Sequence, residues 1–143
     1  MIRICFVCHG NICRSPLAEY LLKSKLKDLN LLDNFHIESK AISDEEEGND
    51  IYPPIKEVMD KHNISYDTHH ATQLLPSDYD KFDYFICMDD YNIKTIKYTF
   101  NNTDKVSKLL NRDVSDPWYT RDFDTAYKDI SEGIDNLIKK ITN

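Results

Sequence analysis

The first sixteen residues constrain the fold more than any other part of the chain. Ile2–Val7 is a short apolar run of the kind that forms a buried parallel strand. A tight loop follows, and Ser15-Pro16 is typical of a helix start, because serine can cap a helix and proline suits its first turn. The segment therefore predicts a strand, a loop and a helix, with the loop amides at the positive end of the helix.

The rest of the chain alternates between strand and helix patterns. Helical spacing of leucines continues the first helix to about Asn30. Further strands are predicted at Phe35–Ala41, Tyr84–Met88 and Val106–Leu110, a short extended segment at Thr68–Gln73, and helices at Pro53–His62, Asp90–Phe100 and Asp122–Ile141. This alternation predicts an α/β fold, a three-layer sandwich with a central parallel sheet of about four strands and helices on both faces. No repeat or linker divides it, so residues 1–143 are predicted to form a single domain.

Charge and cysteine content narrow the class of protein. The net charge of −7 argues against nucleic acid as a partner, because nonspecific binding to phosphate backbones needs a basic surface. There is no apolar run of 18 residues and no signal-peptide pattern, so no membrane partner is expected. Four cysteines are too few and too unevenly spaced for a secreted disulfide framework. We expect a cytoplasmic protein with reduced thiols that acts as a monomer, with at most weak self-association.

The loop after the first strand has the residues of an anion site with a nucleophile. Cys8 stands at its start and Arg14 at its end, and a guanidinium can bind two phosphate oxygens at once. Gly10 permits close backbone approach, and Asn11 tolerates left-handed geometry. Backbone amides, the helix N-terminus and the arginine would together favour the thiolate, and the hydroxyl of Ser15 could help the sulfur leave.

The loop also has two less specific interpretations, redox chemistry and metal binding. Cys5 and Cys8 form a Cys-x-x-Cys pair, which in other proteins serves redox chemistry or zinc binding. Residues three apart on a strand point to opposite faces, and no second cysteine pair or suitably spaced histidine pair completes a zinc site. We therefore expect no metal and no cofactor.

At these residues the sequence resembles the low-molecular-weight protein tyrosine phosphatases. The match is Val-Cys-x-Gly-Asn-Ile-Cys-Arg-Ser-Pro at Val7–Pro16, and it extends over nearly the whole chain. Phe82-Asp83-Tyr84 leading to Cys87-Met88-Asp89, and Asp116-Pro117-Trp118-Tyr119, also look like the family. The resemblance implies hydrolysis of phosphotyrosine, in a protein or a small aryl phosphate, through a phosphocysteine intermediate.

The family's catalytic roles then fall on three residues of this chain. Cys8 would be the nucleophile, Arg14 the phosphate clamp and Asp116 the general acid, later the base for the attacking water. Asp116 could instead be only a turn or helix-start residue. Asp89 and Asp90 are rival carboxylates, but their place directly after a strand fits helix capping better.

Other positions match the family's supporting residues. The resemblance implies that Asn11, Ser15, Ser39 and His69 brace the loop through hydrogen bonds. It also implies that Cys13 can form a reversible disulfide with the nucleophile and so protect it from further oxidation.

The rim of the site departs from the family pattern. The substrate-binding residues would be His9, Gly10, Asn11, Ile12, Cys13, Ser15, Glu45, Trp118 and Tyr119. Glu45 lies in an acidic run where relatives place an aromatic wall, and His9 replaces an apolar residue. Thr72 stands where arginine is common. An acidic run is usually only a solvated surface. Beside the slot that would hold the phenol ring of the substrate, however, it should repel acidic peptides and weaken stacking on that ring.

Three other functions remain as alternatives. Thioredoxin-linked arsenate reductases need two downstream cysteines, and only Cys87 follows the loop here. Protein-arginine phosphatases typically carry threonine where this loop has Ile12, so arginine substrates rank second to phosphotyrosine. A phosphotyrosine-binding module without activity would require the loss of a catalytic residue, yet Cys8, Arg14 and Asp116 are all present.

Overall fold

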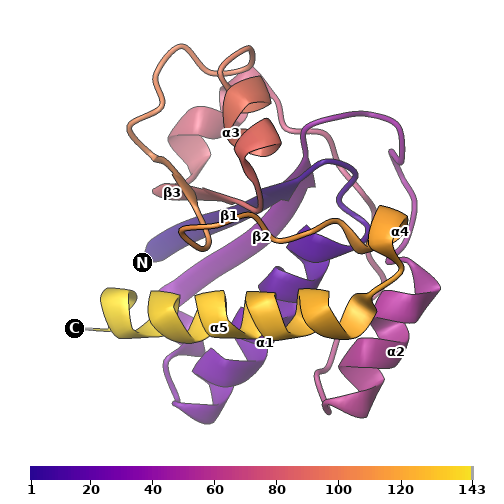
Figure 1. The fold of residues 1–143 in the computed structure, drawn as a ribbon. Coiled ribbons are helices and arrows are strands. Elements are labelled where there is room, and N and C mark those ends of the chain that lie inside the picture. The colour runs from indigo at the N-terminus through magenta and orange to yellow at the C-terminus, as the bar shows by residue number, and fades with distance from the viewer. Residues whose placement is uncertain (143) are drawn as a thin grey trace.

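The structure is a computed structural model in which residues 1–142 are described (Figure 1). Four strands, five α-helices and two 3-10 helices follow one another along these residues. In chain order they are β1 (Ile2–Cys8), α1 (Arg14–Asp28), η1 (Leu32–Asn34), β2 (Phe35–Ala41), α2 (Pro53–Lys61), η2 (Pro76–Lys81), β3 (Tyr84–Cys87), α3 (Asp90–Ile96), β4 (Val106–Lys108), α4 (Pro117–Thr120) and α5 (Phe123–Ile141).

The strands form one parallel sheet in the order β2-β1-β3-β4, which confirms the predicted fold class. In register, Ile4 of β1 pairs with Ile37 of β2 and Tyr84 of β3. The chain moves to one side of β1 for β2 and to the other side for β3. The carboxyl ends of β1 and β3 therefore border a topological switch point, where open parallel sheets bind their ligands.

Two hydrophobic clusters lie on opposite faces of the sheet. Ile4, Phe6 and Cys8 belong to the larger cluster, on the face that α1 and α5 cover (Figure 1). Cys5 and Val7 belong to the smaller cluster, which includes residues of β3, α3 and the segment after α3. This alternation makes the three layers, and it places Cys5 on the opposite face from Cys8. The two cysteines therefore do not act as a pair.

The predicted elements differ from the observed ones mainly at their ends. Phe35–Ala41 is a strand as predicted, whereas the helix predicted to reach Phe100 ends at Ile96. The Thr68–Gln73 segment has only one isolated bridge, between Gln73 and Ala41. The predicted cap at Ser15 is wrong, because α1 begins at Arg14 and its N-cap residue is Cys13, whose side chain makes no capping hydrogen bond. None of the helices within residues 1–142 has the length and apolar character needed to cross a membrane.

Candidate active site

The loop between β1 and α1 directs hydrogen-bond donors at the sulfur of Cys8. The backbone N–H of Asn11 lies 3.3 Å from Sγ of Cys8, and Oγ of Ser15 lies 3.1 Å from it. Asn11 has a φ of 60°, the left-handed conformation that asparagine tolerates, and this turn points its N–H inward. Because the Ser15 hydroxyl accepts a hydrogen bond from Nδ2 of Asn11 at 2.7 Å, its single hydrogen is left to donate to the sulfur. Both contacts stabilise a thiolate.

The buried side chain of Asn11 connects this loop to the neighbouring strand. Its Nδ2 donates to Ser15 and, at 2.9 Å, to Oγ of Ser39 in β2. Ser39 in turn donates at 2.6 Å to Oε1 of Glu19, a buried carboxylate whose other oxygen accepts from Lys23. Each hydroxyl in this chain accepts one hydrogen bond and donates one. The direction of every bond is therefore fixed as far as the Cys8 sulfur.

The far side of Asn11 is held by the segment before η2. Nε2 of His69 lies 2.7 Å from the Asn11 carbonyl oxygen and must donate to it, since a carbonyl oxygen only accepts. The N–H of Thr72 donates to Oδ1 of Asn11 at 3.1 Å. His69 is itself fixed by Asp50, which accepts the His69 backbone N–H at 3.0 Å. All polar groups of the Asn11 side chain are thus paired.

Arg14 is almost completely buried, and acidic and carbonyl oxygens bind its guanidinium. Nη1 donates to Oδ2 of Asp89 at 2.7 Å and to the Val114 carbonyl at 2.8 Å, and Nη2 lies 3.4 Å from Oδ2 of Asp116. Burial lowers the pKa of Arg14, but the charges of Cys8, Asp116 and Asp89 outweigh that effect and the pKa is raised overall. The site therefore holds a permanent positive charge in a fixed orientation.

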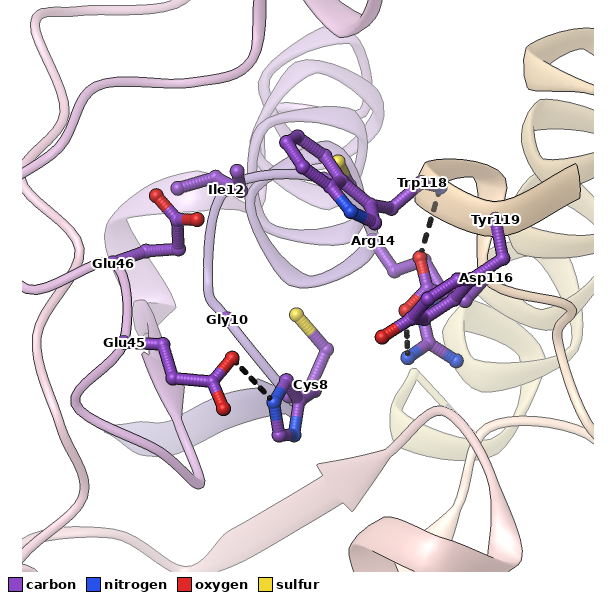
Figure 2. Close-up of a pocket in the computed structure, with 11 residues that line it drawn as sticks. Cys8, Gly10, Ile12, Arg14, Glu45, Glu46, Asp116, Trp118 and Tyr119 are labelled. Atoms are coloured by element: carbon purple, nitrogen blue, oxygen red, sulfur yellow. Dashed lines mark hydrogen bonds and ion pairs between the residues drawn. The ribbon is translucent and has the colours of Figure 1, made fainter. Parts of the chain in front are cut away.

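Asp116 caps helix α4 and also faces Arg14. Its Oδ1 accepts the backbone N–H of Trp118 at 3.0 Å, so the residue is a helix cap. The same contact leaves Oδ2 as the oxygen on the side of Arg14 (Figure 2). Structural and chemical roles for Asp116 are therefore compatible, because each uses a different oxygen.

One pocket brings most of the predicted site residues together. It is lined by Cys8, His9, Gly10, Ile12, Cys13, Arg14, Glu45, Glu46, Asp116, Trp118 and Tyr119. In Figure 2 the Cys8 thiol points between two unlike walls, with Glu45 and Glu46 on one side and Trp118, Tyr119 and Asp116 on the other. Asn11 and Ser15, which were also expected to bind substrate, do not line this pocket. Together with Ser39 and His69 they are buried, and their hydrogen bonds brace the loop.

The aromatic wall has its own support. The ring of Trp118 lies 4.8 Å from that of Tyr52, which also packs near Phe123. The guanidinium of Arg121 lies over the rings of both Tyr52 and Phe123. Trp118 is therefore held in place, whereas Tyr119 is largely exposed at the mouth of the pocket.

The remaining cysteines lack the contacts that Cys8 receives. Burial raises the pKa of Cys5, Cys13 and Cys87, so these thiols stay protonated. All four cysteines are free thiols. Among residues 1–142 no cluster of three or more histidine, cysteine or acidic side chains could hold a metal ion.

Three contributors to the site were missed by sequence reasoning. The sequence favours helix capping for Asp89, and it does cap α3, but it also binds Arg14. The sequence suggests no role for Glu19 or Glu46, yet Glu19 ends the hydrogen-bond chain from Asn11 and Glu46 lines the pocket. The position of Asp89 after the strand next to β1 was the available signal, because parallel strands bring their carboxyl ends to one edge.

Known proteins are similar to this chain in fold and sequence over nearly their whole length. Residues 3–143 match the family described as low molecular weight phosphotyrosine protein phosphatase. The low molecular weight protein-tyrosine-phosphatase PtpA of Staphylococcus saprophyticus is 35% identical, covering 99% of this chain and 94% of the relative. The crystal structure of YfkJ from Bacillus subtilis has a TM-score of 0.96 and 33% identity, covering 99% of this chain and 95% of that one. That of SP-PTP, a low molecular weight protein tyrosine phosphatase from Streptococcus pyogenes, has a TM-score of 0.90 and 37% identity, covering 98% and 93%.

Proposed function

The chain belongs to the low molecular weight phosphotyrosine protein phosphatase family, and from this premise we propose that Cys8, Arg14 and Asp116 carry its chemistry. It is a cysteine-dependent protein-tyrosine-phosphatase. The hydrogen-bond contacts of the Cys8 sulfur support its assignment as the nucleophile. Cys8 receives the Asn11 N–H at 3.3 Å and lies 3.1 Å from the Ser15 hydroxyl, at the floor of the pocket that Asp116 also lines.

In the first half-reaction the thiolate of Cys8 attacks phosphorus. A sulfur–phosphorus bond forms while the bond from phosphorus to the tyrosine oxygen breaks. Arg14 and the loop amides bind the phosphoryl oxygens. They stabilise the negative charge on these oxygens in the transition state. Asp116 donates a proton to the departing tyrosine oxygen through the carboxyl oxygen that does not cap α4.

In the second half-reaction water breaks the phosphocysteine. Asp116, now a carboxylate, accepts a proton from the water as its oxygen bonds to phosphorus. The sulfur leaves as a thiolate, and the Ser15 hydroxyl at 3.1 Å stabilises it. Inorganic phosphate is released and the starting state is restored.

The pocket walls support an aryl phosphate as substrate. Ile12 is apolar and lines the slot, and Trp118 and Tyr119 offer aromatic surface to a phenol ring. We take residues 1–143 as one phosphatase domain that acts as a monomer in the cytoplasm. The small number and uneven spacing of the cysteines support a reducing compartment.

The test is phosphate release from a phosphotyrosine peptide, phenyl phosphate and a phosphoarginine peptide. We expect the phosphotyrosine peptide and phenyl phosphate to be hydrolysed, and Cys8→Ser to abolish the reaction. Asp116→Asn should lower kcat by roughly 10²–10⁴-fold, the usual contribution of a general acid. Activity that survives Cys8→Ser would overturn the mechanism, and faster hydrolysis of phosphoarginine would overturn the substrate class.

A further inference from the structure

The pocket has a carboxylate wall that the phosphatase reaction does not use. Glu45 and Glu46 line the pocket on the side across from Tyr119 and Asp116 (Figure 2). A phosphate dianion entering the pocket must pass these side chains, which by charge alone oppose its entry. A substrate that brings a positive charge beside its phosphate would meet this wall favourably.

Packing and hydrogen bonds hold the wall in place. The methylene groups of Glu46 pack on the catalytic loop, since a Cβ added to Gly10 would lie 3.3 Å from Cγ of Glu46. Its Oε2 accepts a hydrogen bond from Nδ2 of Asn49 at 2.7 Å. The loop is tied at both ends, where the N–H of Ser43 donates to the His9 carbonyl and the N–H of Gly48 donates to the Ala71 carbonyl.

Glu45 is fixed at the rim by the residue that follows the nucleophile. Its Oε2 lies 3.0 Å from Nε2 of His9, while its side chain is 67% exposed. The ring of His9 also lies near that of Tyr91, with centroids 6.2 Å apart. Among residues 1–142, His9 is therefore the one side chain that pairs with Glu45, and it carries charge only when its imidazole is protonated.

Within residues 1–142, the acidic run that contains this wall has no permanently charged partner. Among residues 1–142, no lysine or arginine forms an ion pair with Asp44, Glu45, Glu46 or Glu47. By contrast, Asp50, a few residues further along the chain, forms an ion pair with Lys56 at 2.6 Å. A basic residue of the substrate would supply a cation that matches Glu45 and Glu46.

Building on the proposed function, we infer that this enzyme selects phosphotyrosine flanked by lysine or arginine. The ring would lie against Trp118 and Tyr119, its phosphate on the Cys8 loop, and the basic neighbour against Glu45 and Glu46. The rim carboxylates would thus determine specificity, and peptides with acidic residues beside the phosphotyrosine would be poor substrates.

The test compares short peptides of the form X-phosphotyrosine-X, where X is lysine, alanine or glutamate. At low salt we expect kcat/KM to fall in that order, with about tenfold between lysine and glutamate, the size that a few exposed charge contacts produce. High salt should reduce the ratio, because it screens exposed charges. Equal values for the three peptides, or a preference for glutamate, would overturn the inference without any variant being needed.

Two variants locate the effect on the enzyme. Glu45→Gln with Glu46→Gln keeps the shape of both side chains and should reduce the lysine-to-glutamate ratio to about twofold. Asp44→Asn is the matched control, since Asp44 lies in the same loop but does not line the pocket, and it should retain the ratio. An equal reduction in the control would assign the preference to net charge and overturn the role of the rim.

Phenyl phosphate tests the proposed function independently of the peptide preference. It has no flanking residue, so wild-type hydrolysis of it tests only the proposed function. Hydrolysis of phenyl phosphate without peptide preference would overturn the inference alone. Failure to hydrolyse phenyl phosphate and every peptide would overturn the proposed function and the inference with it.

Discussion

The carboxylate of Asp89 accepts a hydrogen bond from Nη1 of Arg14 at 2.7 Å through one oxygen and caps helix α3 through the other. The two residues are 75 positions apart in the chain. Strands β1 and β3 are neighbours, so the loop after one and the helix after the other begin at the same edge of the sheet. The orientation of the phosphate clamp thus depends on sheet topology.

Replacing Asp89 by asparagine should weaken the hold on Arg14 while the helix cap remains, because asparagine also caps helices well. A charge-assisted hydrogen bond contributes about 1.5–3 kcal/mol, so we expect kcat/KM for phenyl phosphate to fall about 10–100-fold. Inhibition by inorganic phosphate should weaken in parallel, which a merely structural change would not cause. Asp90→Asn is the control, since Asp90 pairs with Lys108 at the surface. An unchanged phosphate inhibition constant in Asp89→Asn would contradict the role of Asp89.

The hydrogen-bond chain through Ser39 gives a prediction for both stability and activity. Ser39→Ala would leave Asn11 and the buried carboxylate of Glu19 each short of one partner. The free energy of unfolding should fall by about 1–3 kcal/mol, the cost of unpaired buried polar groups. Urea unfolding measures this, and kcat/KM should fall with it because the loop loses its brace. Ser39→Thr keeps the hydroxyl and should retain both the stability and the activity of the wild type. Ser107→Ala, at an exposed position of β4, is the control.

The resemblance to the family predicts a protective role for Cys13. Peroxide would oxidise Cys8 to a sulfenic acid, and the Cys13 sulfur would displace water to form a disulfide that thiols can reduce. Burial raises the pKa of Cys13, so oxidation should begin at Cys8 rather than at Cys13. We expect Cys13→Ser to recover less activity than wild type when a thiol is added after peroxide. Equal recovery in the two proteins would show that Cys13 does not protect the nucleophile.

Sequence reasoning found the elements that have a continuous apolar run or apolar residues at helical or alternating spacing. The apolar run of β1 and the leucines of α1 give clear patterns, and Phe35–Ala41 was predicted to the residue. Pro76–Lys81 and Pro117–Thr120 were not predicted as helices, because such short turns have no amphipathic period. Strand β4 has only three residues, since its pairing with β3 and not its composition sets its length.

The site was predictable where residues are adjacent in the chain and less so where the fold joins them. The motif from Cys8 to Arg14 is one segment, so its spacing alone placed nucleophile and clamp together. The contacts of Arg14 with Asp89 and with the Val114 carbonyl join distant segments, and a backbone carbonyl carries no sequence signal. The start of α1 could not be predicted from local sequence preferences alone, because Ser15 points its hydroxyl at Cys8 instead of capping the helix.

Asp50, which fixes the loop-bracing His69, should make the stability of the protein depend on pH in the acid range. The hydrogen bond from Lys56, together with N–H groups of His69 and Ile51, lowers the pKa of Asp50 from 3.8 to about 2. A carboxyl whose pKa is depressed on folding adds stability above its unfolded pKa, and that stability is lost as pH falls from about 4 towards 2. Asp50→Asn should therefore be less stable than wild type at pH 7, by about 1 kcal/mol or less for so exposed a pair. The two proteins should converge near pH 2 in urea unfolding, and a constant difference across this range would contradict the assignment.

The rim leads to a prediction about the aromatic slot. Glu45 stands opposite Tyr119 (Figure 2), so a tryptophan at position 45 would give the substrate ring a second aromatic wall. The substitution also removes a carboxylate that opposes entry of the phosphate. An aromatic contact contributes about 0.5–1.5 kcal/mol, so Glu45→Trp should raise kcat/KM for phenyl phosphate roughly 2–10-fold. Glu45→Gln isolates the effect of charge and should give the smaller increase. An unchanged or lower kcat/KM in Glu45→Trp would contradict the view that this position forms a wall of the slot, since a ring there would then fail to contact the substrate.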